Sequence, residues 1–238
     1  MQHALLLLPV VLPVIFWGAY HYHKDRHLPE PAGNLALCFV LGLAAAALSK
    51  GMYLALEPLG WRLDAVALAE TDGGALFRYA VLAIGPIEEF SKLLPFVLIV
   101  VHFRSFDEPL DGIIYASFIA LGYAAVENYH YLDFLTPAES FARGFAGPVV
   151  HILFASIWAY WITTVWLAKR RLMGPAIAGF VIAAFLHGTY DFLVLRQPVA
   201  ALPIAATMIG VLWVWRLRLM HRLHENAAGD TGGPQAGS

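Results

Sequence analysis

Long apolar runs dominate this chain of 238 residues and restrict the folds open to it. Seven of them have roughly the 17–25 residues that an α-helix needs to cross the hydrocarbon core of a bilayer. They cover residues 4–20, 34–57, 75–103, 110–132, 148–168, 175–194 and 198–217. Only 13% of the residues are charged, against about 25% in a soluble domain. The sequence therefore predicts an all-α, multi-pass membrane bundle of about seven transmembrane helices.

The bundle is expected to form one domain, residues 1–224, because only three loops of any length interrupt it. These loops are residues 21–33, 60–74 and 133–147. The tail 225–238 is rich in Gly, Ala and polar residues, a composition typical of disorder. The net charge of −2 and the lack of a basic block give no reason to expect a nucleic-acid partner.

Lys and Arg are distributed unequally between the two sides of the predicted bundle. Nine of them fall on the side of the C-terminus, and three, Arg62, Arg143 and Arg196, fall on the other. Positive residues accumulate in cytoplasmic loops. We therefore expect the N-terminus outside and the C-terminus in the cytoplasm.

Two adjacent glutamates, Glu88 and Glu89, lie inside the apolar run 75–103. A carboxylate near the bilayer centre costs about 2.5–3.5 kcal/mol, and its neighbour adds repulsion. The pair is therefore expected to be functional, with one carboxyl holding a proton that the other lacks. Gly85-Pro86 should break the run and place both glutamates in the first turn of a new helix. The structural alternative is a charge pair balanced by Lys92 on the same helical face.

Four further polar residues are expected at the same depth as the glutamates. Glu127 lies near the end of its span, His151 near the start of the next, and His187 and Asp191 in the last two turns of another. Asp191 lies four residues after His187, so it can accept the far ring N–H of this histidine, as behind metal-binding or catalytic imidazoles. Asp111 is expected only to occupy the first turn of its helix.

Four motifs in order give the chain a resemblance to a known family. They are Glu88-Glu89-x-x-Lys92; Asp111-Gly112 followed by Gly122-Tyr123-x-x-x-Glu127-Asn128; His151 at the start of a span; and His187-x-x-x-Asp191. Over residues 75–195 the chain resembles the PrsW family of intramembrane proteases. That family is similar in pattern to the CAAX prenyl endopeptidases, but Glu127 and Asp191 stand where those have His and Asn, which argues against prenyl-protein processing.

The resemblance implies an endopeptidase that cleaves a single-span membrane protein, such as an anti-sigma factor, within the lipid bilayer. Cleavage would take place near the extracytoplasmic face of a bacterial cytoplasmic membrane. We assign the catalytic site to Glu88, Glu89, Lys92, Glu127, His151, His187 and Asp191.

Two arrangements of these residues could hydrolyse an amide. In one, Glu127, His151 and His187 bind Zn²⁺, Glu89 is the general base for the bound water, and Asp191 lies behind His187. In the other there is no metal, Glu88 or Glu89 activates water directly, and His187 or His151 donates to the oxyanion. The H-E-x-x-H zinc motif is absent, but the resemblance to metallopeptidases favours the first arrangement.

Two other functions fit the same residues. Paired acids, a lysine and histidines near one membrane face also suit a proton- or cation-coupled transporter. A transporter should contain matched broken helices, and the sequence has one clear break, at Gly85-Pro86. The third possibility is a scaffold subunit that keeps the motifs without activity.

Overall fold

The computed structural model describes residues 7–24, 29–170, 173–196 and 201–230, and this part of the chain is helical with no strand. The helices are α2 (Leu8–Lys24), α3 (Ala32–Ala55), α4 (Ala65–Thr71), α5 (Gly73–Tyr79), α6 (Gly85–Leu98), α7 (Pro109–Tyr131), α8 (Pro137–Leu167), α9 (Gly174–Arg196) and α10 (Ala201–Asp230). A π-helical segment, η2 (Ala80–Ile84), joins α5 to α6, and short 3-10 turns, η1 (Glu57–Leu59) and η3 (Val100–His102), follow α3 and α6.

Within the described residues, five helical segments are long and apolar enough to cross a membrane: Ala32–Leu59, Pro109–Tyr131, Pro137–Leu167, Gly174–Arg196 and Ala201–Glu225. The two other predicted spans correspond to α2, which has 17 residues, and to the column α5–η2–α6. The prediction of a helical membrane bundle is confirmed, and the protein is an integral, multi-pass membrane protein.

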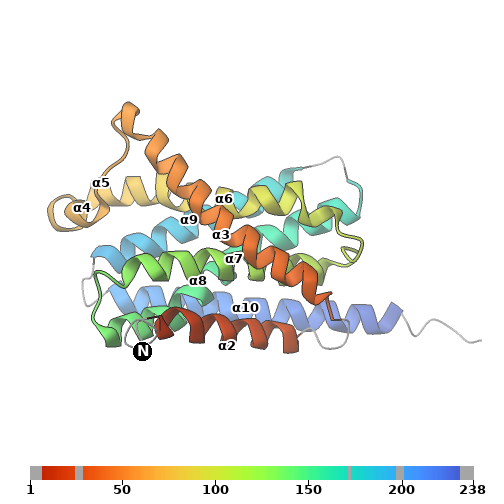
Figure 1. Ribbon diagram of the computed structural model, residues 1–238. Helices are drawn as coiled ribbons and strands as arrows, with labels where there is room; N and C mark the ends of the chain where they lie inside the picture. The colour runs from red at the N-terminus through yellow and green to blue at the C-terminus, as the bar shows by residue number, and fades with distance from the viewer. Residues whose placement is uncertain (1–6, 25–28, 171–172, 197–200, 231–238) are drawn as a thin grey trace, which may run out of the picture.

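Helix α7 forms the centre of the bundle. It packs most extensively against α8 and α3, and 83% of its apolar window is buried, compared with 11% for α10. Figure 1 shows α6 and α9 on one side of this centre, α2 and α10 on the other, and α3 crossing it obliquely. The buried core, which includes Tyr115, Phe154 and Trp158, therefore lies mainly along α7 and α8.

Close helix contacts at two glycines hold η2 and α6 against α9. A Cβ atom on Gly85 would lie 2.1 Å from the carbonyl oxygen of Ala184, and one on Gly188 would lie 2.3 Å from that of Ala80. Backbones can approach this closely only where no side chain intervenes, as in small-residue contacts between membrane helices. Since Gly188 follows His187 and Gly85 precedes Glu88 by one turn, this contact brings the paired glutamates to the histidine.

The irregularity predicted at Gly85-Pro86 is a π-helical turn. Ile84 and Gly85 keep helical dihedral angles, so the chain does not leave the helical path, and α6 begins at Gly85 with Pro86 in its first turn. Proline has no N–H to donate, and its ring clashes with the carbonyl group four residues earlier, so it interrupts the α-helical hydrogen-bond pattern. Such interruptions inside α-helices include single π-helical turns. Glu88 lies in the first turn of α6, as expected, but Glu89 does not, so the expectation that both glutamates occupy this turn is wrong for Glu89.

The prediction of a loop at residues 133–147 is wrong for most of its length. Helix α8 begins at Pro137, so His151 lies several turns inside it rather than near its start. A capping box causes this early start, because the Thr136 hydroxyl accepts from the Glu139 N–H and the Glu139 carboxylate accepts from the Thr136 N–H. Pro148, the first residue of the predicted span, lies within the helix.

The other expected loops also contain helix. Within residues 60–74, α4 begins after an Asp64 cap and α5 after an Asp72 cap. The loop 21–33 contains the end of α2 and the start of α3, and residues 25–28 fall outside the described residues. Helix α10 continues through residues 225–230, and the rest of the expected tail is not described.

Asp111 was expected in the first turn of its helix, and this is confirmed for α7. Its carboxylate accepts from the backbone N–H groups of Asp107 and Glu108.

Candidate active site

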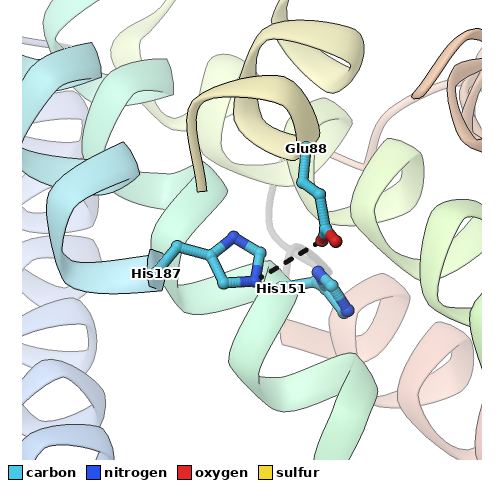
Figure 2. A group of neighbouring side chains, drawn as sticks. All are labelled: Glu88, His151 and His187. Atoms are coloured by element: carbon cyan, nitrogen blue, oxygen red, sulfur yellow. Dashed lines mark ion pairs between the residues drawn. The ribbon is translucent and has the colours of Figure 1, made fainter. Parts of the chain in front are cut away.

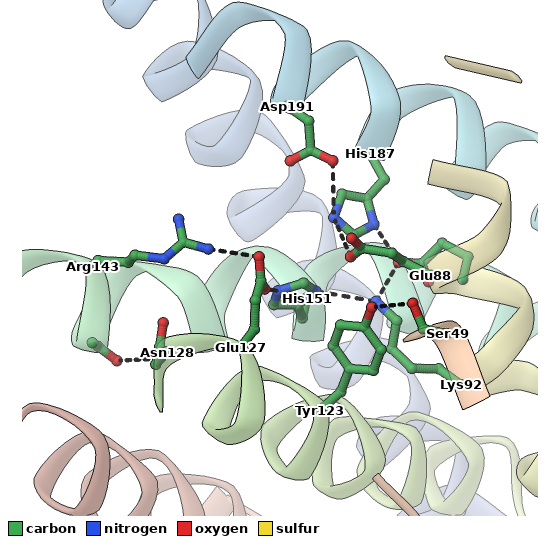
Figure 3. Close-up of polar contacts among 12 residues, drawn as sticks. Ser49, Glu88, Lys92, Tyr123, Glu127, Asn128, Arg143, His151, His187 and Asp191 are labelled. Carbon is green, nitrogen blue, oxygen red and sulfur yellow. Dashed lines mark hydrogen bonds and ion pairs between the residues drawn. The ribbon is translucent and has the colours of Figure 1, made fainter. Parts of the chain in front are cut away.

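The structure brings the residues singled out in the sequence into one polar cluster inside the bundle. They come from four helices: Glu88, Glu89 and Lys92 from α6, Glu127 from α7, His151 from α8, and His187 and Asp191 from α9. Figure 3 shows their side chains joined by a nearly continuous series of polar contacts. Each residue contacts at least one other member of this set, directly and within 4 Å.

Glu89 lies at the buried end of the cluster, and its side chain is 0% exposed. Its Oε1 accepts from Lys92 Nζ at 2.7 Å and lies 2.6 Å from His187 Nδ1. Its Oε2 accepts from Trp158 Nε1 at 2.7 Å. With three donors on its two oxygens, Glu89 is a satisfied buried carboxylate whose geometry suits anchoring other side chains.

Glu88 occupies a different environment, although it is the next residue. Its side chain is 11% exposed and contributes to two cavities. Its Oε1 accepts a long hydrogen bond from the Tyr53 hydroxyl, at 3.3 Å, and its Oε2 has no hydrogen-bond partner. Glu88 therefore presents the less engaged carboxylate oxygen of the pair.

His187 lies between the two glutamates. Nδ1 contacts Glu89, and Nε2 lies 3.6 Å from Glu88 Oε2 and 3.7 Å from Asp191 Oδ2. The expectation that Asp191 would back the far nitrogen of His187 needs correction, because Asp191 faces the same nitrogen as Glu88, and Glu89 backs the other. The i, i+4 spacing placed Asp191 near the ring but could not tell which nitrogen it would face.

His151 connects Lys92 to Glu127. Its Nδ1 lies 3.1 Å from Lys92 Nζ, and its Nε2 lies 2.5 Å from Glu127 Oε2. An ammonium group can only donate, so Nδ1 accepts from Lys92 and the ring proton on Nε2 points to Glu127. This assigns the tautomer of His151. Lys92 also forms an ion pair with Glu89, at 2.7 Å.

Arg143 belongs to the cluster, although its sequence position suggested an external loop. Its Nη2 donates to Glu127 Oε1 at 2.6 Å, and its guanidinium lies 3.5 Å from the centroid of the Tyr131 ring. The capping box at Thr136 was the signal that could have revealed it. Once α8 begins there, Arg143 precedes His151 by eight residues, about two helical turns, and shares its face.

Trp158 and Tyr53 were also missed. Trp158 belongs to none of the four motifs, but it follows His151 by seven residues on the same face of α8 and donates to Glu89. Tyr53, in α3, donates to Glu88. No motif marks Tyr53, because its role depends on how α3 crosses α6.

Two cavities meet at the cluster. One, of about 640 Å³, includes Lys50, Tyr123 and His130 in its lining, and the other, of about 260 Å³, includes Arg143, Tyr190 and Asp191. Both contain Glu88 and Glu127. A larger groove of about 810 Å³ between α6, α8 and α9 is lined mostly by apolar side chains and contains none of these residues. Glu88 therefore lines both polar cavities and not the apolar groove.

The donor atoms of Glu88, His151 and His187 all lie within 4.8 Å of one another, and they form the one such group among the described residues. Figure 2 shows the three side chains converging from α6, α8 and α9. Two imidazoles and one carboxylate are the donor set of many catalytic zinc sites. The carboxylate behind His187 Nδ1 is the partner that metal-binding histidines usually have. These residues fit a metal ion only if it displaces Lys92 or Glu127 from a ring nitrogen of His151. Glu88 would then take the position that the sequence assigned to Glu127.

Comparison with known proteins places this chain in a family. The family whose sequence model matches the chain, over residues 30–217, is described as PrsW family intramembrane metalloprotease. No solved structure matches the chain.

Individual relatives support the family match, and three of them carry the name Protease PrsW. The protein from Geobacillus kaustophilus is 28% identical over 203 residues, covering 85% of each chain. That from Oceanobacillus iheyensis is 27% identical, covering 91% of this chain and 94% of the relative. That from Bacillus subtilis is 27% identical, covering 77% and 79%. The chain therefore belongs to the PrsW family, whose members are intramembrane proteases of the bacterial membrane.

Proposed function

We propose that this protease cleaves a membrane-anchored protein by means of a water molecule that Glu88 activates. The observation that carries the proposal is the contrast between the two adjacent glutamates. Glu88 has a carboxylate oxygen without a hydrogen-bond partner beside the cavities, whereas Glu89 has three donors and no exposure. A general base needs a free lone pair within reach of the water that it deprotonates.

The position of His187 supports this role for Glu88. The 3.6 Å between Glu88 Oε2 and His187 Nε2 is too long for a direct hydrogen bond, and a water oxygen can contact both atoms. In the proposed reaction Glu88 takes one proton from this water, and the resulting hydroxide adds to the substrate carbonyl carbon. Glu88 then transfers the proton to the leaving amine as the C–N bond breaks.

The charge that develops on the carbonyl oxygen needs a donor. When His187 carries a proton on Nε2, that N–H is directed toward Glu88 and can stabilise the oxyanion, while Glu89 holds Nδ1 on the opposite side of the ring. Glu89, together with Lys92 and Trp158, would position His187 rather than react. This reverses the role that the sequence suggested for Glu89 as general base.

The remaining charged residues would hold the cluster in place. Arg143 neutralises Glu127, Glu127 orients His151, and His151 accepts from Lys92, which neutralises Glu89. This series of contacts keeps the acids and imidazoles in a fixed arrangement with few unpaired charges (Figure 3). Because the side chains are already in place, less free energy is needed to reorient charged and polar groups as the transition state forms.

A zinc ion is the alternative to this metal-free route, because His187 Nε2 cannot bind a metal and donate a proton at the same time. Glu88, His151 and His187 are the residues that would hold the ion, with Glu127 next to His151 Nε2. When bound, zinc would polarise the substrate carbonyl and make the water more acidic. Elemental analysis of the purified protein separates the two routes. The zinc route predicts about one zinc per chain, lost in His187→Ala but kept in a control, His102→Ala, since His102 lies outside the cluster.

The substrate is proposed to be a single-span membrane protein such as an anti-sigma factor, cut near the extracytoplasmic face. The positive-inside distribution of Lys and Arg supports this orientation. The position of Glu127 and Asp191 close to the C-terminal ends of α7 and α9 would then place the cluster in the outer half of the membrane.

Cleavage of a candidate single-span substrate in reconstituted vesicles tests the function. Glu88→Gln should lower the rate by about 10²–10⁴-fold, the usual contribution of a general base, and His187→Ala should also abolish cleavage. Glu70→Gln, a change in an exposed glutamate of α4, is the control and should keep the wild-type rate. Retained turnover in both site variants would contradict the roles proposed for these residues, and the absence of cleavage by the wild type would favour a scaffold.

A further inference from the structure

The apolar groove of about 810 Å³ has no part in the proposed reaction. It runs between the C-terminal halves of α6 and α8 and the first half of α9, and its volume is in the range of sites for small organic ligands. Apolar side chains from all three helices form its walls, among them Leu93, Val97, Ile162, Val165, Ile177 and Phe180. Two lining residues, Phe90 and Ile177, are 39% and 60% exposed, so the groove is open at the surface of the bundle.

Two basic residues, Lys169 and Arg170, line one end of this groove. They follow Leu167, the last residue of α8, which lies 16 residues and about 24 Å along the helix from His151. Both side chains are exposed, and within the described part of the chain neither forms an ion pair. The described residues that line the groove include no acid. One end of an apolar groove therefore carries two uncompensated positive charges.

The turn that ends α8 fixes the position of these two residues. The Lys169 N–H donates to the Trp166 carbonyl at 3.0 Å, and the Arg170 N–H donates to the Val165 carbonyl at 3.2 Å, which is the pattern of a Schellman motif. Its left-handed position is usually a glycine, but here Lys169 occupies it, with φ of 48°. A side chain in this conformation has a steric cost that glycine avoids. Backbone strain of this kind concentrates at ligand-binding sites, so the lysine points to a role for its ammonium group.

The length of the groove matches one leaflet of a bilayer. Phe90 and Val101, at the two ends of the wall that α6 and η3 supply, are 11 positions apart, which is about 16 Å along a helix. This is about half of the roughly 30 Å hydrocarbon core. Trp166 lies beside the two cations and is 44% exposed, as is typical of a tryptophan at the level of the lipid headgroups. The groove therefore fits a lipid of one leaflet better than a helix that crosses both.

We propose that this groove binds an anionic phospholipid, with its phosphate at Lys169 and Arg170 and an acyl chain along α6, α8 and α9. The phosphate oxygens accept charge-assisted hydrogen bonds from the two cations, and the apolar walls remove the acyl chain from contact with water. Basic pockets between transmembrane helices recognise lipid headgroups in this way. The lipid fills the space between α6 and α9 at the end away from the catalytic cluster, and the site does not depend on the proposed reaction.

Native mass spectrometry of the purified full-length protein in a neutral detergent tests this site. Phosphatidylglycerol and phosphatidylcholine with identical acyl chains compete for the protein. We expect the wild type to prefer the anionic lipid by about 30-fold, the effect of two basic residues at a headgroup. The double variant Lys169→Gln, Arg170→Gln should lose this preference. The control, Arg218→Gln with Arg222→Gln, removes the same charge from exposed positions of α10 and should keep it.

A second variant separates lipid binding from a structural role of the lysine. Lys169→Gly should raise the melting temperature of the lipid-free protein, because glycine adopts the left-handed conformation without strain. The same variant should retain less phosphatidylglycerol than the wild type. Unchanged retention of the anionic lipid in Lys169→Gly would contradict the role proposed for the ammonium group.

Three further results would overturn the proposal. The first is equal retention of the two lipids by the wild type, or a preference that the double glutamine variant keeps. The second is displacement of the lipid by glycerol phosphate, which carries the headgroup charge without acyl chains and would indicate a site for free phosphate. The third is displacement by an equimolar neutral single-span peptide, which would assign the groove to a transmembrane helix.

Discussion

Glu89 Oε1 lies 2.6 Å from His187 Nδ1, although the two residues are 98 positions apart in the chain. The same oxygen accepts from Lys92, so α6 and α9 are joined through one buried carboxylate. This contact makes Glu89 part of the framework of the site and leaves Glu88 as the member of the pair that faces the cavities.

The two glutamates should therefore differ in their effect on stability. Glu89→Gln leaves the Lys92 ammonium buried without a carboxylate, which should lower the free energy of unfolding by about 3–5 kcal/mol. Glu88→Gln should change it by less than about 1 kcal/mol, because one oxygen of Glu88 has no partner to lose. Denaturant unfolding in detergent measures both values. Equal losses in the two variants would contradict the division of roles.

Arg143 should act on catalysis through Glu127 and His151. Arg143→Gln removes the ion pair with Glu127, and we expect kcat to fall by about 10–100-fold with KM nearly unchanged, the usual size of a positioning effect. Arg143→Lys keeps the charge and should recover part of the rate. The control is Arg104→Gln, since Arg104 is exposed and lines neither of the two polar cavities. A rise in KM with constant kcat would instead place Arg143 in substrate binding.

Gly188 should be required for the close approach of α9 to η2 and α6. A Cβ at this position would lie 2.3 Å from the carbonyl oxygen of Ala80, so Gly188→Ala forces the two helices apart. Overpacking of this kind costs about 1–3 kcal/mol, and the shift of His187 should reduce cleavage by about 10²-fold. Gly51→Ala is the matched control, because a Cβ there meets no atom within 4 Å. Wild-type cleavage by Gly188→Ala would show that this close contact is dispensable.

The expected orientation can be tested by labelling cysteines with a membrane-impermeant thiol reagent. In a Cys38→Ser background, Phe134→Cys should react from outside intact cells, because residue 134 follows α7 on the predicted outer side and is 81% exposed. Arg104→Cys, exposed between η3 and α7, should react only after the membrane is opened. The reverse pattern would invert the orientation and place the catalytic cluster near the cytoplasm.

Local patterns predicted those parts of the fold that depend on near neighbours in the chain. Apolar runs gave the helical spans, because a backbone in lipid must satisfy its own hydrogen bonds. Pro109 and Asp111 marked the start of α7 correctly. The same approach failed at residues 133–147, which lie between two apolar runs and were therefore expected to form a loop. There the local capping box at Thr136 and Glu139 prevailed, and it placed Arg143 on a helix.

The polar residues of the cluster could be found from the sequence because ionisable side chains are rare and costly in a membrane interior. Their partners could not, since a hydrogen bond between helices depends on crossing angle and rotation. Trp158 and Tyr53 had no recognisable signal for this reason, and Asp191 faces a nitrogen of His187 that spacing alone could not select.

The amino-acid sequence by itself determined that the chain crosses the membrane several times and carries acids and imidazoles at one depth, since both follow from the cost of exposing polar groups to lipid. Only the tertiary structure decided which of two identical neighbouring side chains is held by Lys92, His187 and Trp158 and which faces the cavities. Adjacent residues on a helix point about 100° apart, so the packing of α8 and α9 around α6 assigns their different environments.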